Sequence, residues 1–390
     1  MRERIHHKKL IWLLFFPVGV ILFFLSSLFP AVTETFYSGM VYGYIRNIQA
    51  VMTSWAGFSI AEFIVYALTL YVIIKLGKTV YVSLRKNRAH KLRYAVNTLL
   101  DFCIAASVIY FLFVVLWGIN YNRQPFAETA GIEVREYSVD ELNEVCLMMI
   151  DRANTLRDQV PEDMDGNVLL TGGYPDMLAY GIFGFPVGSG ADSPTAGYRD
   201  ILNKAWIEYD NVKSEYCTLD KRYNRPKPVI ASEIMCFAGI TGIYFPLTGE
   251  ANINVKISQA ELPFTACHEL AHQAGFSRED EANFISWLVC DRSSNISFSY
   301  SGNLMAMIHL LNSLYENDSG KWAAARGLCS DKVNRDLIAQ GQFWERYEGP
   351  VQDISTSVND TYLKANLQED GVKSYGRMVD LLIAYLIRDN

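Results

Sequence analysis

The chain opens with three long apolar stretches. The first, from Leu10 to Phe29, has no charged residue, and the others run from about Ala56 to Ile74 and from about Phe102 to Ile119. A helix needs about 20 mostly apolar residues to cross about 30 Å of hydrocarbon. A cleavable signal peptide is the competing interpretation of the first stretch, but no A-x-A site closes it and two more stretches follow. The pattern therefore predicts a membrane domain, residues 1–121, with transmembrane helices over about 10–29, 56–74 and 102–119.

Beyond residue 121 the apolar positions recur with the shorter periods of a folded domain. Ser138 and Glu141 have the form of a capping box, and the helical period after them predicts a helix to about Gln159. Residues 166–197 are rich in Gly, Pro, Ser and aromatic residues, which is typical of a long ordered loop. The other elements expected before residue 250 are one helix and two short strands, over about 196–217, 228–232 and 240–246.

From residue 251 onward, the spacing of apolar residues first follows the period of two of a strand and then changes to the 3.6 of a helix. In ANINVKIS, from Ala251 to Ser258, apolar and polar residues alternate strictly, which predicts a half-buried strand. Apolar residues on one helical stripe follow, at Phe264, Cys267, Ala271 and Ala274. Gly275 is expected to end this helix as a C-terminal cap.

A second helix is expected directly afterwards, with Ser277 as its N-cap and its end at about Cys290, and residues 303–390 are nearly all helical in pattern. The predicted fold class is three N-terminal transmembrane helices followed by a mainly helical α+β domain over residues 122–390. A small sheet should lie next to the helix that contains residues 264–274.

Charge divides the chain and predicts its orientation. Residues 1–125 hold 13 Lys/Arg against 4 Asp/Glu, whereas the rest hold 22 against 38. Seven basic residues separate the second and third stretches, but the connection from Pro30 to Trp55 has only Arg46. The positive-inside rule therefore predicts a multi-pass protein of the cell membrane with a cytoplasmic N-terminus and an extracytoplasmic C-terminal domain. Because that acidic domain has no basic stripe, nucleic acid is not an expected partner.

The candidate chemistry lies in His268-Glu269-Leu270-Ala271-His272. Histidines at i and i+4 share a helix face, so both imidazoles can bind one Zn²⁺, and the glutamate between them can reach a metal-bound water. The alternative is an ordinary histidine pair on a surface helix. Only three histidines follow the membrane domain, and two of them fall in this pattern, while His309 among Leu and Met residues is typical of a core histidine.

A third zinc ligand is needed, because catalytic zinc sites have three protein ligands and one open position. The acidic turn after Gly275 offers Glu279 and Glu281. Glu279 would share a polar face with Asn283, whereas Glu281 would point toward the core, where it could accept a ring N–H of a ligand histidine. From the residues alone both glutamates stay open as ligands.

Several runs resemble a bacterial membrane family designated domain of unknown function 3810. They are GIYFPLTGEANIN from Gly242 to Asn254, ELPFTACHELAHQAGFSREDEANFISWL from Glu261 to Leu288, and SYGRMVDLLIAYL from Ser374 to Leu386. With the three spans, the resemblance covers nearly the whole chain. It implies a zincin-like metallopeptidase domain and brings no known substrate.

A more distant resemblance is to zincins whose third ligand is a Glu four residues before an Asn or Asp. Glu279 and Asn283 match that pattern, so the resemblance selects Glu279 as the third ligand. Metzincins would instead carry a His six residues after the second ligand, and that position here is Arg278.

The expected function is a membrane-anchored zinc-dependent peptidase. Zn²⁺ held by the two histidines and Glu279 would lower the pKa of its water toward ~7, and Glu269 would act as the general base. Tyr375 is the candidate donor to the developing oxyanion. The expected partners are the lipid bilayer and an extended peptide or protein substrate, paired with the strand over 251–258.

Other functions compete with this one. A non-catalytic envelope protein, for scaffolding or binding, would use a structural zinc, but it has no use for Glu269. An intramembrane protease is disfavoured because residues 259–292 are too charged to span a membrane. A peptidoglycan endopeptidase lacks support from any glycan-binding module. No phosphate-binding fingerprint occurs, so no nucleotide is expected, and seven cysteines without a CxxC pair indicate buried hydrophobic residues rather than a disulfide framework.

Overall fold

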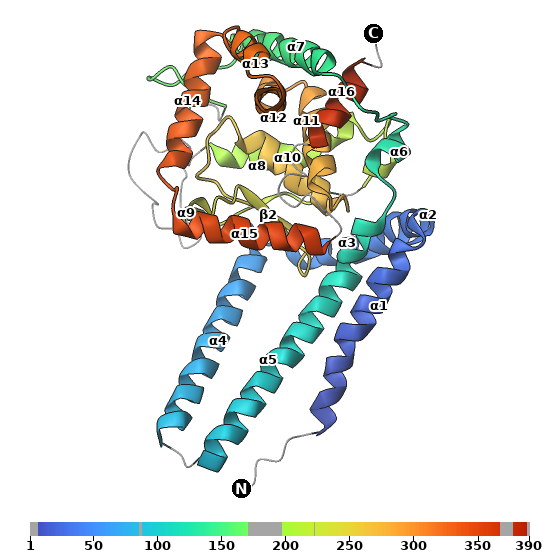
Figure 1. The fold of residues 1–390 in the computed structure, drawn as a ribbon, viewed down its shortest axis with the longest axis vertical. Coiled ribbons are helices and arrows are strands. Elements are labelled where there is room, and N and C mark those ends of the chain that lie inside the picture. Colours follow the sequence, from blue (N-terminus) through green and yellow to red (C-terminus); the bar gives the residue numbers. More distant parts are fainter. Residues whose placement is uncertain (1–6, 86–87, 171–196, 222, 367–376, 388–390) are drawn as a thin grey trace. The chain divides into compact units, whose positions relative to one another are not determined.

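The computed structural model describes residues 7–85, 88–170, 197–221, 223–366 and 377–387. The chain divides into two compact units, which are described separately. Unit 1 comprises Met1–Gln124 and Phe245–Gly249, and unit 2 comprises Pro125–Tyr244 and Glu250–Asn390. The described residues are mostly helical, with one small sheet (Figure 1).

Unit 1 contains three helices that are long and apolar enough to cross a membrane, over Lys9–Ser27, Ile60–Arg85 and His90–Leu116. They correspond to α1 (Phe15–Ser27) with the preceding η1 (His7–Leu14), to α4 (Ile60–Arg85) and to α5 (Arg88–Leu116). The prediction of three such helices is confirmed. Helices α4 and α5 are longer than the apolar stretches, because the basic residues that flank these stretches continue the helical backbone.

The first and second long helices are joined by further helix rather than by a loop. The connecting elements are α2 (Pro30–Val32), the π-helix η2 (Thr33–Val41) and α3 (Tyr42–Thr53). After α5 follows the short η3 (Gly118–Asn122).

The apolar stretch that starts at Phe102 suggests that Asp101 lies at a helix end. Instead Asp101 lies well inside α5. Its carboxylate is 2.8 Å from Nζ of Lys75 and 3.1 Å from Nζ of Lys9. Two lysines therefore compensate this acid inside the helical unit.

Unit 2 is built from helices around one core. Its helices are α6 (Phe126–Ala130), α7 (Val139–Arg157), α8 (Tyr198–Glu208), α9 (Ser232–Phe237), α10 (Leu262–Gln273), α11 (Glu279–Asp291), α12 (Ile296–Asn317), α13 (Ser319–Arg326), α14 (Asp331–Glu345), α15 (Pro350–Ala365) and α16 (Met378–Ile387), with short turns η5 (Tyr209–Asn211) and η6 (Cys217–Leu219). The capping box of Ser138 and Glu141 at the start of α7 is confirmed. Helices α7, α10, α11 and α12 supply most of the fully buried apolar side chains. All seven cysteines are free, and five are buried.

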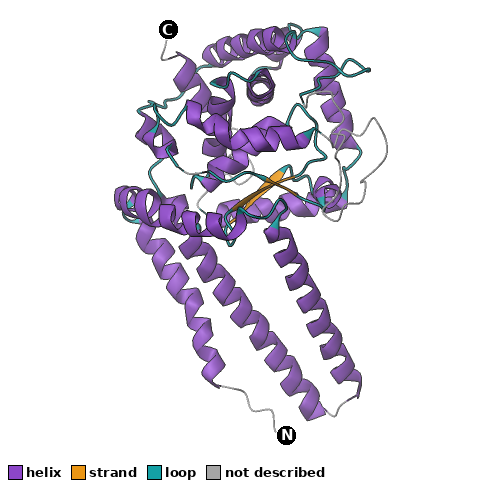
Figure 2. Ribbon diagram, turned by 180° about the vertical axis from the view of Figure 1, so that it is seen from behind, coloured by secondary structure: helices purple, strands orange, loops and turns teal. Residues whose placement is uncertain are grey.

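The sheet has three strands, β1 (Lys227–Pro228), β2 (Gly242–Phe245) and β3 (Glu250–Ile253), in the order β1-β3-β2 (Figure 2). Strand β3 is central and pairs in parallel with β1. A strand is present at the start of the predicted range, 251–258, but β3 ends at Ile253 and is buried on both faces, so the predicted length and half-burial are wrong. Its alternating polar residues point into internal hydrogen bonds instead. The side chain of Asn252 donates to the carbonyl of Ile243 at 3.2 Å, and that of Asn254 to Ile240 at 2.9 Å.

A fully buried ion pair joins two helices of unit 2. Arg157 of α7 contacts Asp336 of α14, and both side chains have no exposed area. The Asp336 carboxylate also accepts hydrogen bonds from the Tyr300 hydroxyl at 2.6 Å and the Val168 N–H at 2.8 Å. A buried carboxylate that accepts from Arg157 of α7, Tyr300 of α12 and the Val168 backbone holds these parts of the unit in one arrangement.

Replacing Asp336 with Ala should lower the free energy of unfolding by about 3–5 kcal/mol, because the buried Arg157 charge loses its fully buried partner and keeps only the contact with the partly exposed Glu162. Lys332→Ala is the matched control on the same helix: its ion pair with Asp158 is exposed and should contribute less than about 1 kcal/mol. Denaturant unfolding of the purified chain in detergent, followed by fluorescence, measures both. Equal small losses would mean that the buried pair does not hold α7 to α14.

Candidate metal centre

Helix α10 carries His268, Glu269 and His272, and it is buried along almost its whole length. Pro263 lies in its first turn, where no N–H donor is required. The carboxylate of Glu261, just before the helix, accepts hydrogen bonds from the side chains of Gln340 and Trp344. Of the twelve residues, all except His268 are buried. The two histidines therefore do not lie on an ordinary surface helix.

The turn after α10 orients the ring of His272. Gly275 has φ +95°, a conformation that favours glycine, and it reverses the chain. The carbonyl of Phe276 then lies 2.7 Å from Nδ1 of His272. With the proton on Nδ1 donated to this carbonyl, Nε2 keeps the lone pair that a metal requires.

Glu279 completes a cluster of three possible ligands. Its Oε2 lies 3.2 Å from Nε2 of His268 and 3.5 Å from Nε2 of His272. One ligand atom from each side chain lies within 4.8 Å of the others, and this is the sole group of its kind among the residues that the structure describes. The two rings are nearly perpendicular, with centroids 4.7 Å apart. Glu279 is the first residue of α11, whose N-cap is Arg278, so the predicted cap at Ser277 is wrong.

The charges of the cluster are coupled. Burial opposes a charge on Glu279, but the neighbouring His272 and His268 outweigh it and hold the pKa of Glu279 well below its usual range. Burial also opposes a charge on His272, yet the Glu279 carboxylate raises the pKa of His272 to about 9. Without a metal, the carboxylate is thus ionised beside a protonated ring. A divalent cation bound by these side chains would take the place of that proton.

Glu269 lies beside this cluster with its carboxylate enclosed. Only 4% of the residue is exposed, and burial raises the pKa of its carboxyl. The backbone N–H of Tyr244 in β2 donates a hydrogen bond to it. Its Oε2 has no hydrogen-bond partner within the described parts of the chain. An enclosed carboxylate oxygen without a donor is available to take a proton.

Strand β2 packs directly against Glu269, a contact that the sequence pattern did not reveal. A Cβ added to Gly242 would lie 2.6 Å from Oε1 of Glu269, so any side chain there would displace the carboxylate. Gly242 starts the run GIYF, and a glycine at the start of a short apolar strand is the one signal for such a close approach.

Glu281 has a different role from the one expected. Its Oε1 accepts the backbone N–H of Phe126, at the start of α6, at 2.7 Å. The ring N–H of His272 goes to the Phe276 carbonyl instead. The expectation that Glu281 accepts a ring N–H is therefore wrong for His272, and Glu281 fastens α6 to α11.

Two further side chains were singled out in the sequence, His309 and Tyr375. His309, on α12, is not part of the ligand group, and burial together with the charge of His268 lowers its pKa to about 4. Tyr375 lies outside the described residues.

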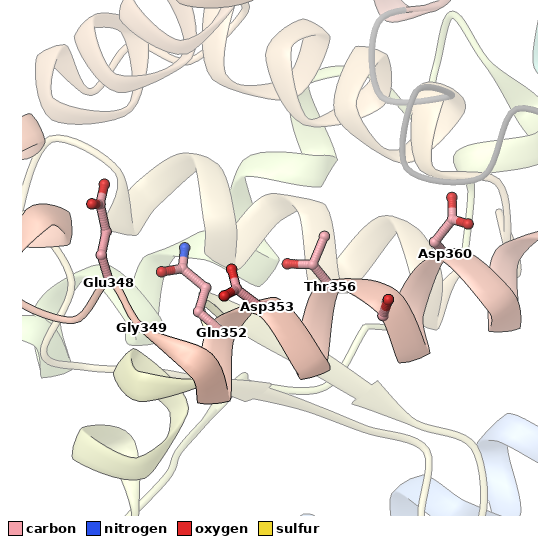
Figure 3. Close-up of a pocket in the computed structure, with 7 residues that line it drawn as sticks. Glu348, Gly349, Gln352, Asp353, Thr356 and Asp360 are labelled. Carbon is pink, nitrogen blue, oxygen red and sulfur yellow. The ribbon is translucent and has the colours of Figure 1, made fainter.

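A separate polar groove of about 780 Å³ runs along α15, and Figure 3 shows its side chains projecting from the helix and the residues just before it. It is lined by Glu348, Gly349, Gln352, Asp353, Thr356, Ser357 and Asp360. None of these residues belongs to the histidine and glutamate cluster. The groove is therefore not the metal centre.

Residues 37–383 match the family model described as Protein of unknown function (DUF3810). The chain belongs to this family. No curated protein and no solved structure matches it. The range shared with DUF3810 includes β2, α10 and α11 entirely, and with them every residue of the cluster.

Proposed function

We propose that this DUF3810 protein is a membrane-anchored, zinc-dependent peptidase with a zincin-like catalytic domain. The observation that carries the proposal is the convergence of His268, His272 and Glu279, with the enclosed carboxylate of Glu269 beside them. A cluster that served only a structural metal would not need this fourth, unligated carboxylate.

The donor set fits zinc. Two imidazole nitrogens and one carboxylate oxygen are the protein ligands of one class of catalytic zinc site, in which a fourth position stays open. The hydrogen bond from Nδ1 of His272 to the Phe276 carbonyl is the outer contact that such a ligand requires. Zn²⁺, when bound, would supply Lewis-acid chemistry by polarising the scissile carbonyl and acidifying the attacking water.

Glu269 would move the proton. Its unpartnered Oε2 would accept the proton of the attacking water and then return it to the leaving amine. The Tyr244 N–H and the backbone at Gly242 hold the carboxylate in place during both steps. Tyr375 remains our proposed donor to the oxyanion.

The substrate strand is better assigned to β2 than to β3. Strand β3 has a neighbour on each side, so its backbone is already paired, whereas β2 is an outer strand of the described sheet. Since β2 also touches Glu269, an extended peptide that pairs with β2 would lie beside the proposed base. The earlier expectation of pairing along residues 251–258 is therefore replaced.

A digest of a peptide pool tests this function. The full chain, purified in detergent with its metal content measured, is incubated with the pool, and new termini are identified by mass spectrometry. We expect cleavage that stops when a chelator removes zinc and returns when zinc is added. Bound zinc without any cleavage would favour the alternative, a non-catalytic scaffolding or binding protein with a structural zinc.

Topology gives a second expected result. Unit 2 should lie outside the cytoplasmic membrane, because basic residues concentrate between α4 and α5 and before α1. A reporter that is active only outside should therefore work when fused after Asn390. Activity of the same reporter inserted at Asn87 would reverse the orientation.

A further inference from the structure

The segment of residues 30–55, here called the crossing segment, joins two membrane-spanning helices within unit 1. It consists of α2, η2, α3 and the turn after α3. Figures 1 and 2 show that it runs across the ends of α1 and α5 and not alongside them. Its first residue follows the end of α1, and its last residues precede the start of α4.

The outward side of the crossing segment is apolar. Eight large apolar side chains along it are between 54% and 72% exposed: Val32, Phe36, Met40, Tyr44, Ile48, Val51, Met52 and Trp55. In α3 and the turn after it, four of them follow the spacing i, i+4, i+7 and i+11, so they form one stripe on a helical surface.

Several polar side chains of the segment lie on its inward side, whereas Thr35, Asn47 and Ser54 are exposed. The hydroxyl of Ser38 donates to Oδ1 of Asn120 at 2.8 Å, and Nε2 of Gln49 donates to the carbonyl of Pro246 at 2.7 Å. The segment has two charged residues. Glu34 pairs with Arg123 at 2.6 Å, and Arg46 is 4% exposed.

This arrangement is the reverse of a helix at a water-facing surface, which turns its polar side outward. A continuous exposed apolar face without a charge is rare on water-soluble proteins and marks a contact with a partner or a membrane. We propose that the crossing segment lies in the interfacial zone of the bilayer, with its outward face in contact with lipid.

Lipid is the occupant because the apolar face continues an apolar surface that already meets the membrane. Phe29, just after α1, and Phe63, at the start of α4, are 60% and 47% exposed, so the apolar surface extends from both spans onto the segment. Both ends of the segment must lie at the same membrane surface, because one span ends and the next begins there. Tyr44 and Trp55 have the amphipathic rings that concentrate at that depth.

Site-specific photo-crosslinking tests this proposal independently of any peptidase activity. The photoreactive residue p-benzoylphenylalanine replaces Ile48 or Val51 in the full chain, which is reconstituted singly into phosphatidylcholine nanodiscs and illuminated. Ile73, on α4, is the positive control, and Ile338, an isoleucine of unit 2 that is 55% exposed, is the matched negative control.

We expect lipid adducts, detected by mass spectrometry, at Ile48, Val51 and Ile73, and none at Ile338. Failure of one of the two segment variants to fold leaves the other to give the result. Absence of lipid adducts at Ile48 and Val51 while Ile73 is labelled would overturn the proposal. A second outcome would also overturn it: in proteoliposomes with many copies of the chain, adducts that join two copies instead of linking the chain to lipid. The face would then be an interface between proteins.

Discussion

Glu269→Gln should reduce the kcat/KM of peptide cleavage by about 10²–10⁴-fold, the usual contribution of a general base, while the chain keeps its zinc. Glutamine has nearly the same shape and can still accept the hydrogen bond from the Tyr244 N–H, but it cannot take a proton from water. The three ligand side chains are unchanged in this variant. Cleavage rate and zinc content, measured on the same preparation, separate loss of the base from loss of the metal.

Glu261→Gln is the matched control for this experiment. Glu261 is also buried and lies just before the same helix, and its carboxylate accepts hydrogen bonds from Gln340, Trp344 and the Ser258 backbone, which a glutamine oxygen can also accept. We expect it to keep most of the activity. Equal cleavage by wild type and Glu269→Gln would remove Glu269 as the base.

Glu279→Ala should weaken zinc binding by more than about 100-fold, because removal of even an outer contact of a metal site costs about 10–100-fold in affinity and Glu279 is a proposed direct ligand. Glu281→Ala removes the acceptor of the Phe126 N–H, so it should cost about 1–3 kcal/mol of stability with a much smaller change in zinc affinity. Competition with a fluorescent zinc chelator measures both affinities.

The comparison of these two alanine variants decides between the carboxylates. Thermal unfolding of each variant, with and without zinc, shows whether a change in affinity comes from a lost ligand or from a loosened helix. A larger loss of zinc affinity in Glu281→Ala than in Glu279→Ala would mean that the wrong glutamate has been assigned.

Features that depend on local pattern were predicted well from the sequence. Three apolar stretches gave three long helices, because length and hydrophobicity alone decide whether a helix can span a membrane. The helix with His268 and His272 and its end before Gly275 followed from periodicity and from glycine's tolerance of positive φ.

Features that depend on distant contacts were not predicted. Strict alternation suggested a half-buried strand, but Asn252 and Asn254 bind backbone carbonyls inside the fold, which no local pattern encodes. The Glu281 carboxylate accepts the backbone N–H of Phe126, a residue 155 positions away in the sequence. The sequence treated residues 30–55 only as a connection between two spans, and the helices of this segment, with large apolar side chains exposed, were not predicted.

Zinc titration of the metal-free chain tests the central claim most directly. The full chain is stripped with a chelator, zinc is restored in steps, and bound zinc and the rate of peptide cleavage are measured at each step. We predict that cleavage rises in proportion to bound zinc and reaches its maximum at one zinc per chain, and that His272→Ala shows neither high-affinity binding nor cleavage. Cleavage that is independent of zinc, or full zinc binding by His272→Ala, would contradict the assignment of a catalytic zinc centre to His268, His272 and Glu279.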